Sequence, residues 1–135
     1  MARKKHNYSG KIRTETAERI YKYVMNELTG NKRYLDSGLT AAQLVKELNT
    51  NPRSFSMVMK CHMRGSFNTV VNRLRIQRAT HMLKIKKYKD ITCEEIGLMC
   101  GFASRQSYYN AFKREQGITP AAYRSLKRNS NKKEK

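Results

Sequence analysis

Apolar residues recur at intervals of three and four positions along most of this chain, which is the spacing of one face of an α-helix. The first run starts at Thr16 and contains Ile20, Val24 and Leu28, and we expect Gly30 to stop it. No stretch of useful length alternates apolar with polar residues, as a half-buried β-strand would. The hydrophobic pattern therefore predicts an all-α protein.

A pair of short helices is predicted between residues 40 and 63. The segment Thr40-Ala-Ala-Gln43 has the form of a capping box, with a hydroxyl at the N-cap and an amide three residues later. The apolar face behind it comprises Ala41, Leu44, Val45 and Leu48. Asn51-Pro52 then supplies a second N-cap, followed by proline at the first helical position. We expect the second helix to run from Pro52 to about Met63 and Gly65 to stop it. Its predicted core residues are Phe55, Val58 and Met59.

A longer helix and a second pair of short helices complete the pattern. Ser66 is suited to cap a helix over residues 67–84. Thr92-Cys-Glu-Glu95 then has the form of another capping box, and Gly101-Phe102 makes the next turn. Ser104 caps the following helix, which we expect to end at Gly117. A last short helix is predicted to open at Thr119-Pro120. The predicted core residues of this half include Ile91, Ile96, Cys100, Tyr108, Ala111, Phe112 and Tyr123.

The two helix pairs repeat one another. An offset of 52 places Leu39-Thr40 on Ile91-Thr92, and an offset of 53 places Phe55 on Tyr108 and Met59 on Phe112. A short helix, a tight turn and a second short helix form a helix-turn-helix, whose second helix enters a DNA major groove. The longer helix between the pairs has roughly 18 residues and is about 27 Å long. This length is close to the ~34 Å repeat of B-DNA. We therefore expect one chain to read two adjacent grooves without a second copy.

A length of 135 residues suits one compact unit, or two small units that share a rigid element. The pattern predicts a basic flexible arm at 1–15, a first helix-turn-helix subdomain at 16–66 and a linker helix at 67–86. A second helix-turn-helix subdomain is predicted at 87–127, followed by a basic flexible tail at 128–135.

The charge of the chain indicates a polyanionic partner. Lys and Arg number 29 against 10 acids, so the net charge is +19. Residues 1–13 and 124–135 carry +5 each, which leaves +9 on residues 14–123. Two solvated basic tails would therefore explain only about half of the excess. DNA, RNA and an anionic membrane surface are the polyanions that such a charge attracts.

Other classes of protein are disfavoured by what the sequence lacks. Three cysteines, Cys61, Cys93 and Cys100, are an odd number without a CxxC pair, which suits a reducing cytoplasm. His62 and His81 have no partners at metal-ligand spacing, so we expect neither a metal nor a cofactor. No catalytic constellation, secretory signal or membrane-spanning segment stands out. We expect a cytoplasmic, nucleoid-associated protein that is not an enzyme and has no small-molecule ligand.

The second helix pair resembles the signature of the AraC/XylS family. The resemblance lies in Gly101-Phe102-Ala-Ser-Arg-Gln-Ser-Tyr-Tyr-Asn-Ala-Phe-Lys113 and in Gly117-Ile-Thr-Pro-Ala-Ala-Tyr-Arg124. The first pair also fits, and the similarity covers roughly residues 20–124. It implies two homeodomain-like three-helix subdomains joined by a linker helix, which regulate transcription and often activate it.

Three departures from the family are visible. Gly97 stands where Ala is usual, which we expect to weaken its helix slightly, and Met59 replaces the usual Phe. The chain has no room for the effector-binding domain of many members. It is therefore either a short stand-alone member or a fragment of a longer regulator, such as the output end of a two-component system.

Candidate base-reading residues lie early in the second helix of each pair. They are Arg53, Ser56 and Met57 in the first pair and Arg105, Gln106, Ser107, Tyr109 and Asn110 in the second. Arg bonds guanine bidentately, Gln and Asn bond adenine in the same way, and Met or Tyr contacts the thymine methyl group. The competing interpretation is an ordinary solvated helix face, which the repeat and the resemblance make less attractive.

Phosphate contacts are expected from helix N-termini and nearby basic groups. The candidates are Thr50, Asn51, Lys60, Ser104, Lys113 and Arg114. The aromatic residues Phe55, Tyr108, Phe112 and Tyr123 have core spacing and are not expected to stack on bases. Arg75 and Arg78 of the linker helix are interpreted as structural or phosphate-proximal. The arm either enters a minor groove or is simply disordered.

The sequence thus favours a regulator that binds double-stranded DNA sequence-specifically, as a monomer, and that contacts RNA polymerase. Two other classes stay open. One is a binder of RNA or nucleoid DNA without sequence preference, and the other is an interaction module that grips an acidic protein.

Overall fold

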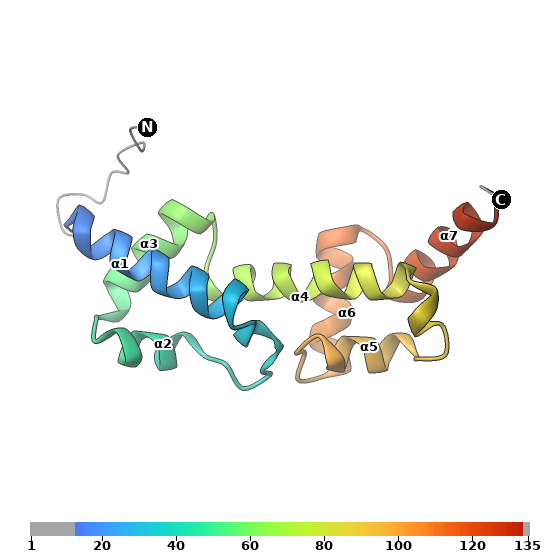
Figure 1. Ribbon diagram of the computed structural model, residues 1–135, viewed down its shortest axis with the longest axis horizontal. Coiled ribbons are helices and arrows are strands. Elements are labelled where there is room, and N and C mark those ends of the chain that lie inside the picture. Colours follow the sequence, from blue (N-terminus) through green and yellow to red (C-terminus); the bar gives the residue numbers. More distant parts are fainter. Residues whose placement is uncertain (1–12, 134–135) are drawn as a thin grey trace. The chain divides into compact units, whose positions relative to one another are not determined.

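The computed structural model describes residues 13–133, with side chains to residue 128. Every regular element in this range is helical, which confirms the all-α prediction (Figure 1). The α-helices are α1 (Thr14–Met25), α2 (Ala41–Leu48), α3 (Pro52–Met63), α4 (Phe67–Lys84), α5 (Cys93–Met99), α6 (Arg105–Gln116) and α7 (Pro120–Lys133). Three single turns accompany them: the π-helical η1 (Asn26–Gly30) and the 3₁₀ turns η2 (Arg33–Leu35) and η3 (Lys86–Tyr88).

The described chain divides into two compact units. The first contains residues 13–33 and 39–71, and the second contains residues 34–38 and 72–133. The helix α4 is thus shared between the units, and the loop at 34–38 belongs with the second unit although it precedes α2. Each unit holds one helix-turn-helix, α2–α3 in the first and α5–α6 in the second.

In the first unit, α1 packs against α2 and α3 around an apolar core. The buried residues include Ile20, Val24, Leu28, Leu44, Leu48, Phe55, Val58, Met59 and Phe67. The capping box at α2 is present, because Gln43 N donates to Thr40 Oγ1 (3.2 Å) and Thr40 N donates to Gln43 Oε1 (2.8 Å). Asn51 caps α3 by accepting from Ser54 N at 2.8 Å, with Pro52 at the first helical position. The helix starts that the sequence predicts here are confirmed.

The helix α3 ends at Met63 as the sequence predicts, but the residue that makes the turn after it differs from the prediction. The helix stops at Met63, and Arg64 takes the left-handed conformation with φ 59°, one residue before the expected Gly65. A non-glycine residue seldom adopts this conformation. The sequence signal, a glycine after the last apolar residue, therefore named the wrong residue for the turn.

The second unit has its own core, which α4, α5 and α6 supply together. Its buried residues are Ile76, Ala79, Met82, Leu83, Ile96, Cys100, Phe102, Tyr108, Ala111 and Phe112, with Tyr123 packed at the edge. Ser104 caps α6 by accepting from Ser107 N (3.1 Å), and Gly117 ends it with φ 79°. Thr92 accepts from Glu95 N at 3.1 Å. No return bond from the Glu95 side chain appears among the described residues, so only half of the second capping box forms.

The last helix is longer than expected. We predicted a short helix at Pro120 and a flexible tail from residue 128, whereas α7 continues to Lys133. Arg124 on α7 donates to Ile91 O (2.7 Å) and Tyr88 O (2.6 Å), which ties the helix to the loop before α5. At the other end of the chain, most of the predicted basic arm lies outside the described residues.

A buried arginine organises the loop at 34–38 in the second unit. Arg75 of α4 is 9% exposed, and it donates from Nε to Tyr34 O (2.7 Å) and from Nη2 to Asp36 O (3.0 Å). Its guanidinium also lies 5.6 Å from the centroid of the Phe102 ring. Burial lowers the pKa of this guanidinium, and the two carbonyls supply the partners that a buried cation needs. The structural interpretation of Arg75 is therefore the one that the contacts support.

Candidate nucleic-acid interface

The helix α3 separates its side chains into a buried face and an exposed face. Phe55, Val58 and Met59 face the core, as predicted. The three candidate base-reading residues lie elsewhere on the helix: Arg53 and Ser56 are exposed, and Met57 is half-buried. A one-residue shift in register would move the core side chains out, so the apolar packing fixes which residues face solvent.

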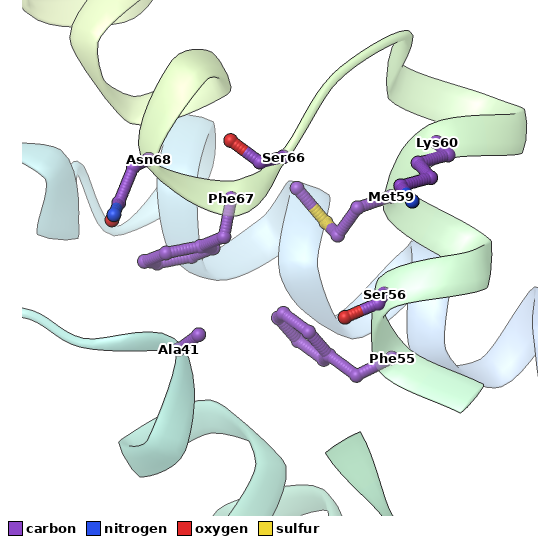
Figure 2. Close-up of a pocket in the computed structure, with 8 residues that line it drawn as sticks. All are labelled: Ala41, Phe55, Ser56, Met59, Lys60, Ser66, Phe67 and Asn68. Atoms are coloured by element: carbon purple, nitrogen blue, oxygen red, sulfur yellow. The ribbon is translucent and has the colours of Figure 1, made fainter. Parts of the chain in front are cut away.

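A small depression opens between α3 and the start of α4 (Figure 2). Its volume is about 250 Å³, and Phe55, Met59 and Phe67 converge on it from the two helices. These three side chains are nearly fully buried, so the depression is shallow and its floor is part of the core. Ser56, Lys60, Ser66 and Asn68 stand around the floor. Ser56 is the repeat counterpart of Tyr109, whose larger ring packs against the core of the second unit.

The helix α6 has the same division as α3. Tyr108, Ala111 and Phe112 are buried, which confirms the prediction that the two aromatic residues, Tyr108 and Phe112, pack in the core. Arg105, Gln106, Ser107 and Asn110 are exposed, and Tyr109 is half-buried. Gln106 Nε2 donates to Asn110 Oδ1 at 3.2 Å, so two candidate adenine-reading amides already lie side by side.

Ser107 is occupied by the helix cap. Its hydroxyl donates to Ser104 O at 3.0 Å, and Ser104 Oγ donates to Ser107 Oγ at 3.1 Å. A hydroxyl engaged in this way retains little capacity to read a base. Of the eight candidate base-reading residues, Ser107 is the one whose contacts are most clearly local.

A carboxylate that we did not single out from the sequence contacts two of the candidates. Glu94 of α5 accepts from Tyr109 Oη at 2.7 Å, and its Oε1 lies 3.7 Å from Arg105 Nη2. The Arg105 guanidinium lies 5.0 Å from the centroid of the Tyr109 ring. Glu94, Tyr109 and Arg105 therefore form one connected cluster, which we call the Glu94 cluster.

The protonation states in the Glu94 cluster follow from these contacts. The bond from Tyr109 holds the pKa of the Glu94 carboxyl below its ordinary value, and Arg105 acts in the same direction. The same bond raises the pKa of Tyr109. At neutral pH the Glu94 carboxyl is therefore ionised and the Tyr109 phenol is neutral.

The candidate phosphate-contacting residues fall into two kinds. Asn51 and Ser104 are N-caps whose side-chain oxygens already accept backbone N–H groups, and Thr50 is a half-buried residue of the turn. The exposed basic candidates are Lys60 on α3 and Lys113 and Arg114 on α6. The lysines occupy matching positions of the repeat, late in each second helix.

Glu94 could not be identified from the local pattern, because its role depends on the packing of α5 against α6. In the sequence it is one of two consecutive acids in the first turn of a helix, where acids are common. The repeat offered the one sequence signal, because it places an acid, Glu94, where the first helix pair has Ala42.

Within residues 13–133, no three His, Cys, Asp or Glu side chains are grouped so that they would hold a metal ion. The cysteines are free thiols, and burial raises the pKa of Cys100 to about 11. No helix in the described part of the chain is long and apolar enough to cross a membrane.

Comparison with known sequences identifies relatives among regulators. The chain is 29% identical over 86 residues, 64% of its length, to the xylose operon regulatory protein of Haemophilus influenzae. It is 30% identical over 93 residues, 69% of its length, to the uncharacterized HTH-type transcriptional regulator YtdP of Bacillus subtilis. The matched segments cover 21% and 12% of these two proteins, so the chain spans a small part of each relative.

Comparison with solved structures shows the fold. The C-terminal domain of AraT, a response regulator from Geobacillus stearothermophilus, matches with a TM-score of 0.67 and 23% identity, covering 84% of this chain and 86% of that one. The C-terminal domain of the two-component response regulator yesN from Fusobacterium nucleatum matches with a TM-score of 0.60 and 24% identity, covering 82% and 99%. A Listeria innocua protein of unknown function matches with a TM-score of 0.69 and 21% identity, covering 79% and 96%.

A family model also matches this chain. The model describes a helix-turn-helix domain and matches residues 44–126, which include both helix pairs from within α2 to within α7. More than half of the chain lies inside the match, and the two relatives above are named as regulators. The chain therefore belongs to the AraC-type family of helix-turn-helix proteins, which are DNA-binding regulators of transcription.

Proposed function

We propose that this chain binds a specific, asymmetric double-stranded DNA site and reads two successive major grooves, one with α3 and one with α6. The observation that carries the proposal is the internal repeat, in which both second helices bury the same face and expose polar residues on the other. A helix that presents such side chains from a helix-turn-helix reads base edges in the major groove.

The exposed side chains supply the chemistry of base reading. Arg53 on α3 and Arg105 on α6 fit guanine, which offers two acceptors in the major groove. Gln106 and Asn110 fit adenine, and the apolar parts of Met57 and Tyr109 fit the thymine methyl group. The two helices carry different residues at matching positions, so the DNA site they favour is asymmetric.

The length of α4 supports reading by a single chain. Its 18 residues correspond to about 27 Å, against ~34 Å between successive major grooves on one side of B-DNA. Two recognition helices within one chain remove the need for a dimer, so we propose binding as a monomer.

Phosphate contacts supply the affinity that does not depend on sequence. Lys60, Lys113 and Arg114 are exposed near the recognition surfaces, and the N-termini of α3 and α6 present backbone N–H groups. With Thr50, Asn51 and Ser104 they form the proposed phosphate-binding set. The net charge of +19 acts in the same direction and attracts the chain to DNA, which is consistent with a place on the nucleoid.

We further propose that the bound protein activates transcription through contact with RNA polymerase. The support is family membership, since members often activate. A reporter gene placed behind the selected DNA site tests the sign of regulation. Expression that rises with the wild-type chain and not with Arg105→Ala supports activation, and expression that falls indicates a repressor.

The proposed reading is tested by selection of bound sequences from a random duplex pool at near-physiological salt. We expect an asymmetric motif with two blocks about one helical turn apart. Arg53→Ala should relax one block and Arg105→Ala the other, while both variants keep the wild-type circular dichroism spectrum. A pool that binds without enrichment, and weakens steeply with salt, would instead identify a nucleic-acid binder without sequence preference.

A further inference from the structure

The second recognition helix carries a support that the first one lacks. On α6, the Tyr109 hydroxyl donates to Glu94 at 2.7 Å, while the Tyr109 ring lies edge-on to the buried Tyr108 with 5.7 Å between centroids. Both ends of the Tyr109 side chain are thus attached to the body of the second unit. A side chain held at two points keeps one rotamer, which is what accurate base reading requires.

Arg105 is attached to the same support. Its guanidinium stacks over the Tyr109 ring at 5.0 Å and lies 3.7 Å from the Glu94 carboxylate. The side chain is nonetheless 70% exposed, so most of its surface faces solvent. Arg has five N–H donors, and these contacts leave enough of them free for a bidentate pair with guanine.

The matching positions of the first unit cannot form such a cluster. The counterparts of Glu94, Arg105 and Tyr109 are Ala42, Pro52 and Ser56. None of these three has a charged group or an aromatic ring. The side chains of Arg53 and Ser56 make no hydrogen bond or ion pair within the part of the chain that the structure describes.

We propose that Glu94 is a positioning residue that sets the base preference of the second recognition helix by holding Tyr109 and Arg105 in one arrangement. The proposal rests on the DNA-reading function proposed above and adds to it a residue that does not itself contact DNA. Each contact is weak alone, because the cluster is solvent-accessible, but together they limit the positions from which Arg105 approaches a base.

The test compares two carboxylates on the same turn of α5. Glu94→Gln and Glu95→Gln change the net charge by the same amount, but the Glu95 side chain is exposed and outside the cluster. Kd is measured by fluorescence anisotropy of the full chain on the selected duplex and on duplexes with single base changes in each block. The discrimination at a base is the ratio of the Kd for the duplex with that base changed to the Kd for the selected duplex.

Glu94→Gln should lower the discrimination about 3- to 10-fold in the block that Arg105→Ala relaxes, and leave the other block within about 2-fold. Tyr109→Phe, which keeps the ring and removes the hydroxyl, should have the same effect in the same block. Glu95→Gln should leave both blocks unchanged, and its small gain in overall affinity calibrates the effect of charge alone.

Three results would overturn the proposal, and they are distinguishable. If the wild type discriminates while Glu94→Gln and Glu95→Gln both retain full discrimination, Glu94 has no positioning role. A lower melting temperature with unchanged discrimination would assign Glu94 to stability instead. If the wild type itself shows no base discrimination, the proposed DNA-reading function fails and this inference fails with it.

Discussion

At the scale of single residues, Gly97 of α5 faces the ring of Tyr108 on α6 with no space for a side chain. A Cβ added at Gly97 would lie 2.4 Å from Tyr108 Cδ2 and 2.6 Å from Cγ. Tyr108 is 1% exposed, and its ring also contacts Phe102 and Phe112, so it has little room to move. From the sequence we expected this glycine only to weaken its helix. The structure gives it a second role, because it admits the Tyr108 ring.

Gly97→Ala should therefore destabilise the protein, although alanine is the better helix former by about 1 kcal/mol. We expect a net loss of about 1–3 kcal/mol in the free energy of unfolding, because overpacking outweighs propensity. Urea denaturation followed by circular dichroism measures it. An increase in the free energy of unfolding would contradict this account, because it would mean that the space between α5 and α6 admits the added methyl group.

Gly101, near Arg75, also occupies a position with no space for a side chain. Its φ is +105°, and an added Cβ would lie 2.3 Å from Tyr34 O, the carbonyl that Arg75 Nε contacts. The turn after α5 therefore requires glycine for two independent reasons, conformation and space. Gly101 is part of the family signature that the sequence displays, and this contact gives a physical reason for it in this chain.

At the scale of elements, a network of ion pairs and hydrogen bonds in the first unit joins α2 to α1 and to the turns η1 and η2. Arg33 donates to both oxygens of Glu47, at 2.7 and 2.9 Å, and to Glu27 at 2.7 Å. The Tyr23 hydroxyl also donates to Glu47. Arg33 first, and then Tyr23, lower the pKa of the Glu47 carboxyl from 4.5 to about 2. The folded state therefore favours the ionised form of Glu47.

The sign of the pH dependence follows from this shift. A carboxyl whose pKa is lowered by folding contributes stability above its unfolded pKa, and the contribution disappears as the pH falls through the folded pKa. The wild type should be more stable than Glu47→Gln at pH 6, and the gap should narrow between about pH 4.5 and pH 2. Thermal unfolding across this range measures the gap. A gap that stays constant over this range would mean that the ionised form of Glu47 contributes nothing to stability. The matched control is Glu115→Gln, which removes an exposed acid from α6.

The elements that the sequence predicted well are those with local signals. The start of each helix after α1 follows from an N-cap and a proline or capping residue within four positions, as at Thr40, Asn51 and Ser104. The buried faces of α3 and α6 follow from spacing alone. The features that we did not predict depend on contacts between distant residues. Examples are the Glu94 cluster, which needs α5 against α6, and the loop at 34–38, which needs a side chain 39 or more positions away.

At the scale of the whole molecule, the positive charge and the recognition helices have separate tasks. Charge attracts any duplex, whereas base contacts select one. We propose roughly 6–8 phosphate contacts in the complex, which corresponds to a slope of about −5 to −7 in a plot of log K against log salt. This slope is a direct count of the ionic contacts that the complex makes.

Lys60→Gln and Lys113→Gln should each reduce the magnitude of that slope by about 1, with similar effects on specific and unrelated duplexes. Lys22→Gln, which removes an exposed lysine from α1 outside the proposed interface, should leave the slope unchanged. Anisotropy titrations at several salt concentrations give all three values. Equal slopes for the wild type and for the Lys60 and Lys113 variants would remove these residues from the phosphate-binding set.

The most direct test of the account is a change in the spacing of the two selected blocks. Inserting five base pairs between them turns one block by about half a helical turn and moves it to the opposite side of the duplex. If one chain reads both blocks at once, affinity should fall to that of a duplex with a single block. A chain bound through α3 can then no longer place α6 on the second block, so Arg105→Ala should cause little further loss of affinity for the block that α3 reads. Affinity that is unchanged by the insertion would contradict simultaneous reading and leave two helices that do not act together.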